Sequence, residues 1–237
     1  MHNIYKNILQ AKTESKKLLA ILLDPDKINW DNLPQLAIKL NASPATHLFV
    51  GGSLVLSNKT DELVVFLKRN LSLPVVLFPG NPSQISQNAD GILFLSLISG
   101  RNPNYLIGHQ VKAAPILKKT NLEVISTGYI LIESGNQTAV SSVSETAPMA
   151  INNPQFIFET AQAGEFLGNK LIYLEAGSGA KNAVPLEIIQ LVAENIAIPL
   201  IVGGGIKNLN DIEKAYHSGA DLVVIGTAFE NDPNLFD

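Results

Sequence analysis

The chain lacks several residue types on which common protein functions depend. Its 237 residues contain no cysteine, only two methionines and one tryptophan, and four scattered histidines. The absence of cysteine excludes disulfide bonds, thiol catalysis and thiolate metal sites together. Four dispersed histidines also disfavour a zinc site. No apolar run approaches the roughly 18 residues needed to span a bilayer, and the polar start, residues 1–17, has no signal-peptide core. We therefore expect a cytoplasmic protein.

The chain also lacks a strong excess of either charge. The formal net charge is −4, and lysine and arginine are spread along the sequence. Such a mild, dispersed balance gives no reason to expect nucleic-acid binding, so an anionic ligand would be held by local groups. With 46% hydrophobic residues, a chain of this length can bury one large core. We expect a single domain over residues 1–237.

Short apolar runs alternate with longer amphipathic segments along the whole chain. Strands that are apolar throughout are typical of a parallel sheet buried on both faces. The pattern predicts eight strands, at residues 19–23, 47–50, 75–78, 91–95, 123–132, 171–175, 200–202 and 222–225. It predicts seven helices, at residues 3–16, 30–40, 61–70, 105–117, 154–167, 186–195 and 208–218. The expected fold class is α/β, a (β/α)8 TIM barrel.

Three segments depart from a regular barrel. Only residues 79–90 separate the third and fourth strands, too few for a crossover helix with its loops, so this helix should be missing or replaced by a loop. Residues 228–237 leave room for only a short final helix. The polar segment 133–153 predicts a long, mobile loop after the fifth strand.

Glycine follows three consecutive strands in the last third of the chain. The blocks are Gly177-Ser178-Gly179, Gly203-Gly204-Gly205 and Gly226-Thr227. Bare backbone N–H groups at such positions can approach an anion, and a helix start can add its positive end. A single glycine block is weak evidence because glycine also ends strands for steric reasons. Its recurrence at one end of neighbouring strands predicts a phosphate-binding cradle.

Other polar residues should lie at the same mouth, because catalytic groups of TIM barrels occupy the carboxyl ends of the strands. Asp24 and Ser53 offer the hard oxygen ligands that Mg²⁺ prefers. Each also has a structural interpretation: Asp24 can cap the following turn, and a serine after two glycines is common in turns. Glu175 is the best candidate for a catalytic carboxylate. Its structural alternative is an ion pair with Lys27 or Lys181.

Six motifs together resemble the geranylgeranylglyceryl phosphate synthases, in that family's order and over essentially the whole chain. They are Leu-Leu-Asp-Pro-Asp-Lys at 22–27, Val-Gly-Gly-Ser at 50–53, Ser-Thr-Gly-Tyr at 126–129, Tyr-Leu-Glu-Ala-Gly-Ser-Gly at 173–179, Val-Gly-Gly-Gly-Ile at 202–206 and Ile-Gly-Thr at 225–227. The fourth motif is the specific one, since many phosphate-binding barrels share the last two. The resemblance implies a barrel without its third helix, in agreement with the short 79–90 segment.

The resemblance also implies an activity: ether-bond formation between sn-glycerol 1-phosphate and a prenyl diphosphate, with magnesium, releasing diphosphate. It assigns Asp24 and Ser53 to magnesium and Glu175 to the base, and we add Lys27, as a phosphate ligand, and Tyr129, as a cap of the pocket, to the catalytic candidates. The residues it assigns to glycerol phosphate are Tyr173, Leu174, Glu175, Ala176, Gly177, Ser178, Gly179, Gly204, Gly205, Gly226 and Thr227. Geranylgeranyl diphosphate is the expected donor, with a longer heptaprenyl diphosphate as the alternative.

This chemistry suits the residues. A glycerol hydroxyl must lose its proton as the C–O bond forms, which is a task for a positioned carboxylate such as Glu175. The prenyl tail needs a long apolar channel, for which the missing helix leaves room. Arg101 either meets the diphosphate or faces solvent, and the histidines are expected to be packing or surface residues.

Two other classes of function stay open on the sequence. One is another sugar-phosphate barrel enzyme, such as an isomerase or aldolase. The other is a barrel that binds a phosphorylated ligand without chemistry. Apolar residues expected on an exposed helix face, Ile157, Phe158 and Phe166, predict at least a homodimer. Transient membrane contact is expected for an enzyme with a lipid product.

Overall fold

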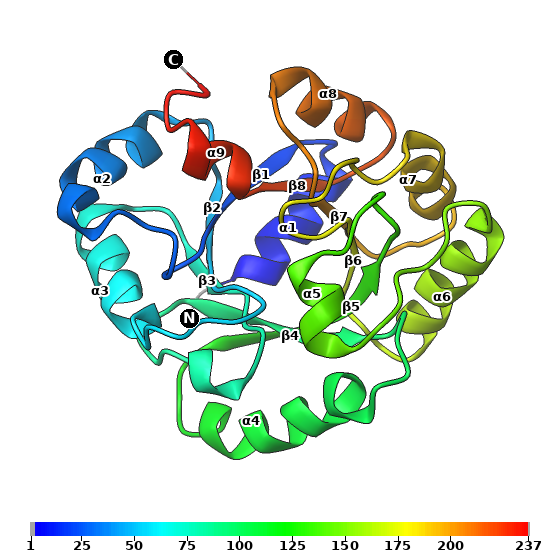
Figure 1. The fold of residues 1–237 in the computed structure, drawn as a ribbon, viewed down its shortest axis with the longest axis horizontal. Helices are drawn as coiled ribbons and strands as arrows, with labels where there is room; N and C mark the ends of the chain where they lie inside the picture. The colour runs from blue at the N-terminus through cyan, green and yellow to red at the C-terminus, as the bar shows by residue number, and fades with distance from the viewer. Residues whose placement is uncertain (1–2, 237) are drawn as a thin grey trace.

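The computed structural model describes residues 3–236, and its centre is a closed barrel of eight parallel strands (Figure 1). Each strand pairs with the next along the chain, and the eighth closes onto the first through Leu18–Leu222 and Ile21–Ile225 pairs. The strands are β1 Leu18–Leu23, β2 His47–Val50, β3 Val75–Leu77, β4 Gly91–Leu97, β5 Glu123–Leu131, β6 Leu171–Glu175, β7 Leu200–Gly203 and β8 Leu222–Ile225. The predicted TIM barrel is confirmed, with each strand within two residues of its expected bounds.

Helices surround the barrel as the amphipathic segments predicted (Figure 1). The α-helices are α1 Ile4–Thr13, α2 Leu33–Ala42, α3 Thr60–Asn70, α4 His109–Leu117, α5 Ala139–Ser144, α6 Pro154–Phe166, α7 Leu186–Ala193, α8 Leu209–His217 and α9 Thr227–Asn231. A turn of π-helix, η3 Asn104–Gly108, leads into α4, and η1 Trp30–Asn32 leads into α2. Among residues 3–236, no helix is long and apolar enough to cross a membrane.

Helix α1 closes the amino-terminal end of the barrel. Its Ile4, Ile8 and Ala11 are buried against interior side chains of the strands, such as Leu18. The carboxylate of Glu123 accepts hydrogen bonds from the first backbone N–H groups of α1, 2.6 Å from Ile4 and 2.9 Å from Tyr5. A carboxylate at a helix N-terminus satisfies otherwise unpaired donors. With this end sealed, the opposite, carboxyl-terminal end of the strands is free to hold a site.

The outer ring has the expected gap between β3 and β4. Only a short turn, η2 Pro82–Gln84, occupies the place of the third crossover helix (Figure 1). The final helix is short as predicted, because α9 has five residues.

Two structural expectations were wrong. Segment 133–153 is not a bare loop: it carries α5, and a bridge from Ile132 to Met149 extends the ordered structure beyond β5. Ile157 of α6, which was expected at the surface, is fully buried, and its neighbour Phe156, which was not, is 48% exposed. Three consecutive apolar residues, 156–158, contain no polar position to mark which side faces solvent.

Candidate active site

A cavity of about 530 Å³ opens at the carboxyl ends of the strands. Strand ends and following segments from β1, β2, β3, β5, β6, β7 and β8 contribute to it. The predicted residues that line it are Asp24, Lys27, Ser53, Tyr129, Tyr173, Glu175, Gly177, Ser178, Gly179, Gly204, Gly205, Gly226 and Thr227. Residues from distant parts of the sequence therefore meet in one chamber.

Glu175 is the buried acid of this chamber, 5% exposed at the end of β6. Its Oε1 accepts a 2.6 Å hydrogen bond from the backbone N–H of Gly177. Burial raises the pKa of the Glu175 carboxyl to about 7, although the Gly177 hydrogen bond and the neighbouring Tyr173 hydroxyl both lower it. The predicted alternatives, ion pairs of Glu175 with Lys27 or Lys181, do not form among the described residues. A carboxyl with a pKa near neutrality can exchange a proton at physiological pH.

An aromatic cluster forms the floor beside Glu175. The rings of Phe78 and Tyr173 stack with centroids 5.3 Å apart, and Tyr129 meets Tyr173 edge-on at 5.2 Å. Burial, with the adjacent Glu175 carboxylate, holds the pKa of both tyrosine hydroxyls well above the usual value. Both tyrosines therefore stay neutral at physiological pH. Tyr129 is buried in this cluster and also lines the cavity.

On the other side of the mouth, Lys27 lies between two carboxylates. Its Nζ is 3.5 Å from Asp24 Oδ2 and 3.7 Å from Glu230 Oε2, and it donates a 3.1 Å hydrogen bond to Ser178 Oγ. Burial raises the pKa of the Glu230 carboxyl, against the lowering effect of the Lys27 cation. Lys27 thus joins the loop after β1 to the loop after β6 and supplies positive charge at the mouth.

Asp24 caps the following turn and also faces the cavity. Its Oδ1 accepts a 3.1 Å hydrogen bond from the backbone N–H of Asp26, which is the turn-capping interaction, while the side chain also lines the cavity. Ser53 lines the same cavity from the loop after β2. Among residues 3–236, no group of three or more His, Cys, Asp or Glu side chains could hold a metal. One carboxylate and one hydroxyl nevertheless fit Mg²⁺, which is commonly held by one or two carboxylates together with substrate phosphates and water.

The glycine blocks after β7 and β8 differ in how tightly they are packed. Gly204 has φ +79°, and a Cβ there would overlap Glu175 Oε1 and lie 2.6 Å from the backbone nitrogen of Gly177. Gly205 has φ +68° and would bring a Cβ to 2.6 Å from Asn182 O. A side chain at either position is therefore excluded by conformation and by space. A Cβ at Gly226 would make only ordinary contacts, 3.5 Å from Leu22. Neither a positive φ nor a lack of space therefore requires glycine at this position.

Three residues singled out in the sequence lie elsewhere. The side chains of Leu174 and Ala176 alternate with those of Tyr173 and Glu175 and pack in the core between barrel and helices, so neither lines the cavity. The guanidinium of Arg101 donates to the backbone oxygens of Gly100, at 2.6 Å, and Ile98, at 3.3 Å, and lines neither this cavity nor the apolar one described next.

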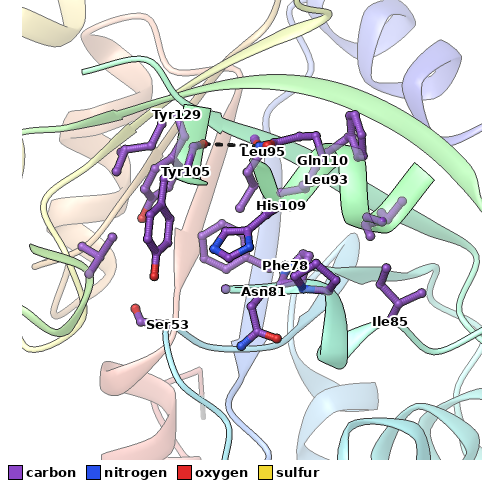
Figure 2. A pocket seen from close by; sticks show the side chains of 18 of the residues that line it. Ser53, Phe78, Asn81, Ile85, Leu93, Leu95, Tyr105, His109, Gln110 and Tyr129 are labelled. Atoms are coloured by element: carbon purple, nitrogen blue, oxygen red, sulfur yellow. Dashed lines mark hydrogen bonds between the residues drawn. The ribbon is translucent and has the colours of Figure 1, made fainter. Parts of the chain in front are cut away.

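A second, apolar cavity of about 100 Å³ lies at the gap in the helix ring. Figure 2 shows Phe78, Tyr105, His109 and Leu93 projecting into it. The Tyr105 and His109 rings meet edge-on at 4.8 Å, and burial, aided by Lys112, lowers the pKa of the imidazole. The two cavities meet, because Gly52, Ser53, Phe78, Tyr129 and Val140 line both. A polar chamber therefore continues into an apolar one.

Sequence reasoning missed Glu230, and it placed Gly203 in the glycine blocks without foreseeing its contact with Glu175. Glu230 lies in the first turn of α9, which begins at Thr227 with Gly226 as its N-cap, so its nearness to these two residues was the available signal. A Cβ at Gly203 would lie 3.0 Å from Glu175 Oε2 and would overlap the Tyr173 hydroxyl. Gly203 therefore leaves the room that both functional side chains occupy.

The fold and the cavity define a (β/α)8 barrel with a buried acid and glycine-rich loops at the carboxyl ends of its strands, the arrangement of barrel enzymes that act on phosphorylated ligands. Comparison with known proteins narrows this class. Residues 11–237 match the PcrB family. The chain belongs to this family, and the resemblance seen in the sequence motifs is confirmed.

The similar proteins agree with one another. The geranylgeranylglyceryl phosphate synthase of Flavobacterium johnsoniae is 66% identical over 99% of this chain and 96% of its own length. The synthase of that name from Pyrococcus furiosus is 41% identical over 94% of this chain and 88% of its own length. The crystal structure of (S)-3-O-geranylgeranylglyceryl phosphate synthase from Thermoplasma acidophilum, in complex with its substrate sn-glycerol-1-phosphate, superposes with a TM-score of 0.92 at 30% identity, covering 100% of this chain and 95% of that one.

Proposed function

We propose that this protein is a prenyltransferase that joins sn-glycerol 1-phosphate to geranylgeranyl diphosphate through an ether bond and releases diphosphate. The observation that carries the proposal is the junction of a polar chamber, which contains a buried acid with a pKa of about 7, with an apolar chamber. The two proposed substrates match these chambers: the polar chamber suits the phosphate-bearing alcohol, and the apolar chamber suits the hydrocarbon tail of the prenyl diphosphate. Relatives named for this activity support the assignment.

Glycerol phosphate binding is assigned to the glycine blocks at 177–179, 204–205 and 226–227. Close packing fixes the backbone of Gly204 and Gly205 in positive-φ conformations, so their peptide groups are preorganised for an anion. Lys27 adds a cation from the opposite loop through its contact with Ser178. The related structure in complex with sn-glycerol-1-phosphate supports the choice of this ligand.

Glu175 is assigned as the general base. The glycerol hydroxyl oxygen forms a bond to C1 of the prenyl group while the bond from C1 to the diphosphate oxygen breaks, and the hydroxyl proton passes to the Glu175 carboxylate. The neutral hydroxyls of Tyr129 and Tyr173 border the site without supplying a competing anionic nucleophile. The stacked rings at the floor suit the cationic character that develops at an allylic carbon.

Asp24 and Ser53, which follow β1 and β2, are the residues that would hold magnesium. When bound, magnesium offsets negative charge on the departing diphosphate. Lys27 and Glu230 set the charge around Asp24, because the ammonium group lies within 4 Å of both carboxylates.

The prenyl tail is assigned to the apolar cavity at the ring gap, where the absent third helix leaves the barrel flank open. A geranylgeranyl tail is the first choice because the named relatives carry that activity, and a heptaprenyl tail is the alternative.

An oligomer, at least a dimer, is also part of the proposal, in a cytoplasmic protein that meets membranes transiently to deliver its product. Helix α6 and the residue after it leave Phe156, Phe166 and Leu167 exposed by 48%, 78% and 82%. Large apolar side chains exposed along one helix favour burial against a second copy. Light scattering at micromolar concentration measures the assembly directly.

The decisive assay combines both glycerol phosphate enantiomers with prenyl diphosphates of several lengths. The expected product is a prenyl ether formed from sn-glycerol 1-phosphate in preference to sn-glycerol 3-phosphate, with magnesium present. Isomerase or aldolase activity on a sugar phosphate instead, or binding of glycerol phosphate with no product from any tail, would favour one of the other two classes.

A further inference from the structure

Gln84 is a buried polar residue that no part of the proposed reaction uses. It is 2% exposed and ends the short turn η2 that replaces the third crossover helix. The Asn81 side chain accepts a 2.8 Å hydrogen bond from the Ser83 backbone N–H, and Pro82 occupies the first turn. These two residues form the single turn that directs Gln84 inward.

The carboxamide of Gln84 binds the loops after β2 and β3 at once. Its Nε2 donates a 3.0 Å hydrogen bond to Gly52 O, and its Oε1 accepts from the backbone N–H of Gly52 at 3.3 Å and of Gly80 at 3.2 Å. One side chain therefore satisfies both backbone groups of Gly52. An amide group supplies this combination of donor and acceptor, which a hydrocarbon side chain cannot.

The loop held in this way borders both substrate chambers. A Cβ at Gly52 would lie 2.9 Å from Asp24 Oδ2, so the Gly52 backbone packs directly on the Asp24 carboxylate. Ser53 follows in the chain, and a Cβ at Gly80 would overlap its carbonyl oxygen. Gln84 itself lines neither cavity, so it lies behind the loop whose front faces Asp24.

We propose that Gln84 is a positioning residue that fixes the loop 51–53 against Asp24 and thereby preorganises the metal and diphosphate side of the site. The inference rests on the proposed function for the identity of the ligands. The turn η2, which replaces the third crossover helix, then has two effects. It leaves the barrel flank open for the prenyl tail, and through Gln84 it holds the loop 51–53 next to the proposed diphosphate site. Loss of such indirect support typically lowers metal affinity by about 10- to 100-fold.

The test compares Gln84→Met with Ser86→Ala. Ser86 lies two residues further on, is equally buried and donates a 2.5 Å hydrogen bond to Asp61 on α3, away from the loop 51–53. Two measurements do not depend on catalytic activity. One is amide hydrogen exchange at Gly52 and Gly80, and the other is Mn²⁺ binding in the presence of inorganic diphosphate, detected by electron paramagnetic resonance. Gln84→Met should speed exchange at both glycines and weaken Mn²⁺ binding by about tenfold, with glycerol phosphate affinity within about twofold of wild type. Ser86→Ala should leave all of these at wild-type values.

Unchanged Mn²⁺ affinity in Gln84→Met, or an equal loss in Ser86→Ala, would overturn the inference. If Gln84→Met does not fold, Gln84→Glu carries the test, because a protonated glutamic acid retains a donor for Gly52 O and an ionised one does not. Its Mn²⁺ affinity relative to wild type should then be lower at pH 8 than at pH 6, and an equal ratio at both values contradicts the inference. A wild-type protein that binds neither Mn²⁺ nor diphosphate would instead count against the metal part of the proposed function.

Discussion

Glu175 Oε1 accepts a 2.6 Å hydrogen bond from the backbone N–H of Gly177, two residues along the chain. This short contact turns the carboxylate back over the loop that begins the glycine-rich motif. The missing Cβ atoms of Gly203 and Gly204 leave the space that the two carboxylate oxygens occupy. Gly177, Gly203 and Gly204 therefore fix the position of the base, whereas burial raises the pKa of its carboxyl.

The first prediction concerns pH. Because only the ionised carboxylate accepts a proton, kcat/KM should rise about tenfold per pH unit below pH 7 and level off above it. The glycerol phosphate group also titrates near pH 6, so its binding must be measured separately by calorimetry over the same range. A profile already flat between pH 5 and pH 7, after correction for binding, would contradict the base assignment.

The same group affects folding stability, with a sign that follows from the direction of its shift. The folded-state pKa is raised to about 7 from 4.5, so the unfolded chain ionises first as pH rises and the fold loses stability between these values. Glu175→Gln removes this titration. At pH 8 the variant should be more stable than wild type by about 1–3 kcal/mol in urea denaturation, and the difference should shrink towards pH 4.

The second prediction concerns the cradle. Gly226→Val should raise the KM for glycerol phosphate far more than the KM for prenyl diphosphate, since the added side chain enters the chamber near the phosphate site. The position tolerates a Cβ, which makes Gly226→Ala a folded control with a smaller effect. Gly204→Ala is a poor substitute because it adds positive-φ strain and overlaps Glu175. Equal increases in both KM values would point to general misfolding.

The third prediction concerns Asp24. Asp24→Asn should remove the response to magnesium and lower turnover by at least about 100-fold, with glycerol phosphate affinity nearly intact, because the glycines of the cradle lie on other strands. Asp26→Asn is the matched control, since the Asp26 carboxylate bonds the backbone of Leu56, at 2.7 Å, and Ser57 rather than the chamber. Calorimetry with glycerol phosphate decides the point. Loss of its affinity as large as the loss of rate would remove Asp24 from the metal role.

The fourth prediction concerns tail length. His109 projects into the apolar cavity (Figure 2), so His109→Trp should favour shorter prenyl diphosphates and His109→Ala longer ones, by about tenfold in relative kcat/KM. His217→Ala, on the exposed face of α8, is the control. Product analysis with mixed donors gives the ratio in one experiment. An unchanged length distribution in both His109 variants would remove the tail from this cavity.

The barrel could be predicted from the sequence because most strands are short, largely buried apolar runs that alternate with amphipathic segments. Segment 79–90 revealed the missing helix by its length alone, since no crossover helix fits in it. The strand-end rule then grouped Asp24, Ser53 and Glu175 in one chamber.

What escaped prediction depends on contacts between distant segments. Glu230 lies close in sequence to Gly226 and Thr227, which places it near the mouth, but this spacing does not show its proximity to Lys27. Helix α5 is built from Ser, Val and Ala and is held by a capping box at Thr138 and Ser141, so its composition resembles that of a loop. The role of Gln84 follows from three hydrogen bonds, two to Gly52, 32 residues away in the sequence, and one to Gly80, four residues away, which periodicity cannot show.

The most direct test of the account is a single-turnover reaction of Glu175→Gln with sn-glycerol 1-phosphate and geranylgeranyl diphosphate, with both binding affinities measured on the same protein. Glutamine keeps the side-chain shape and an acceptor for the Gly177 N–H but cannot take the hydroxyl proton. The account predicts ether formation slower than wild type by about 10²- to 10⁴-fold, with both substrates bound at near wild-type affinity. A near wild-type rate in the variant would contradict the assignment of Glu175 as base, and no ether product from the wild-type protein would contradict the proposed function.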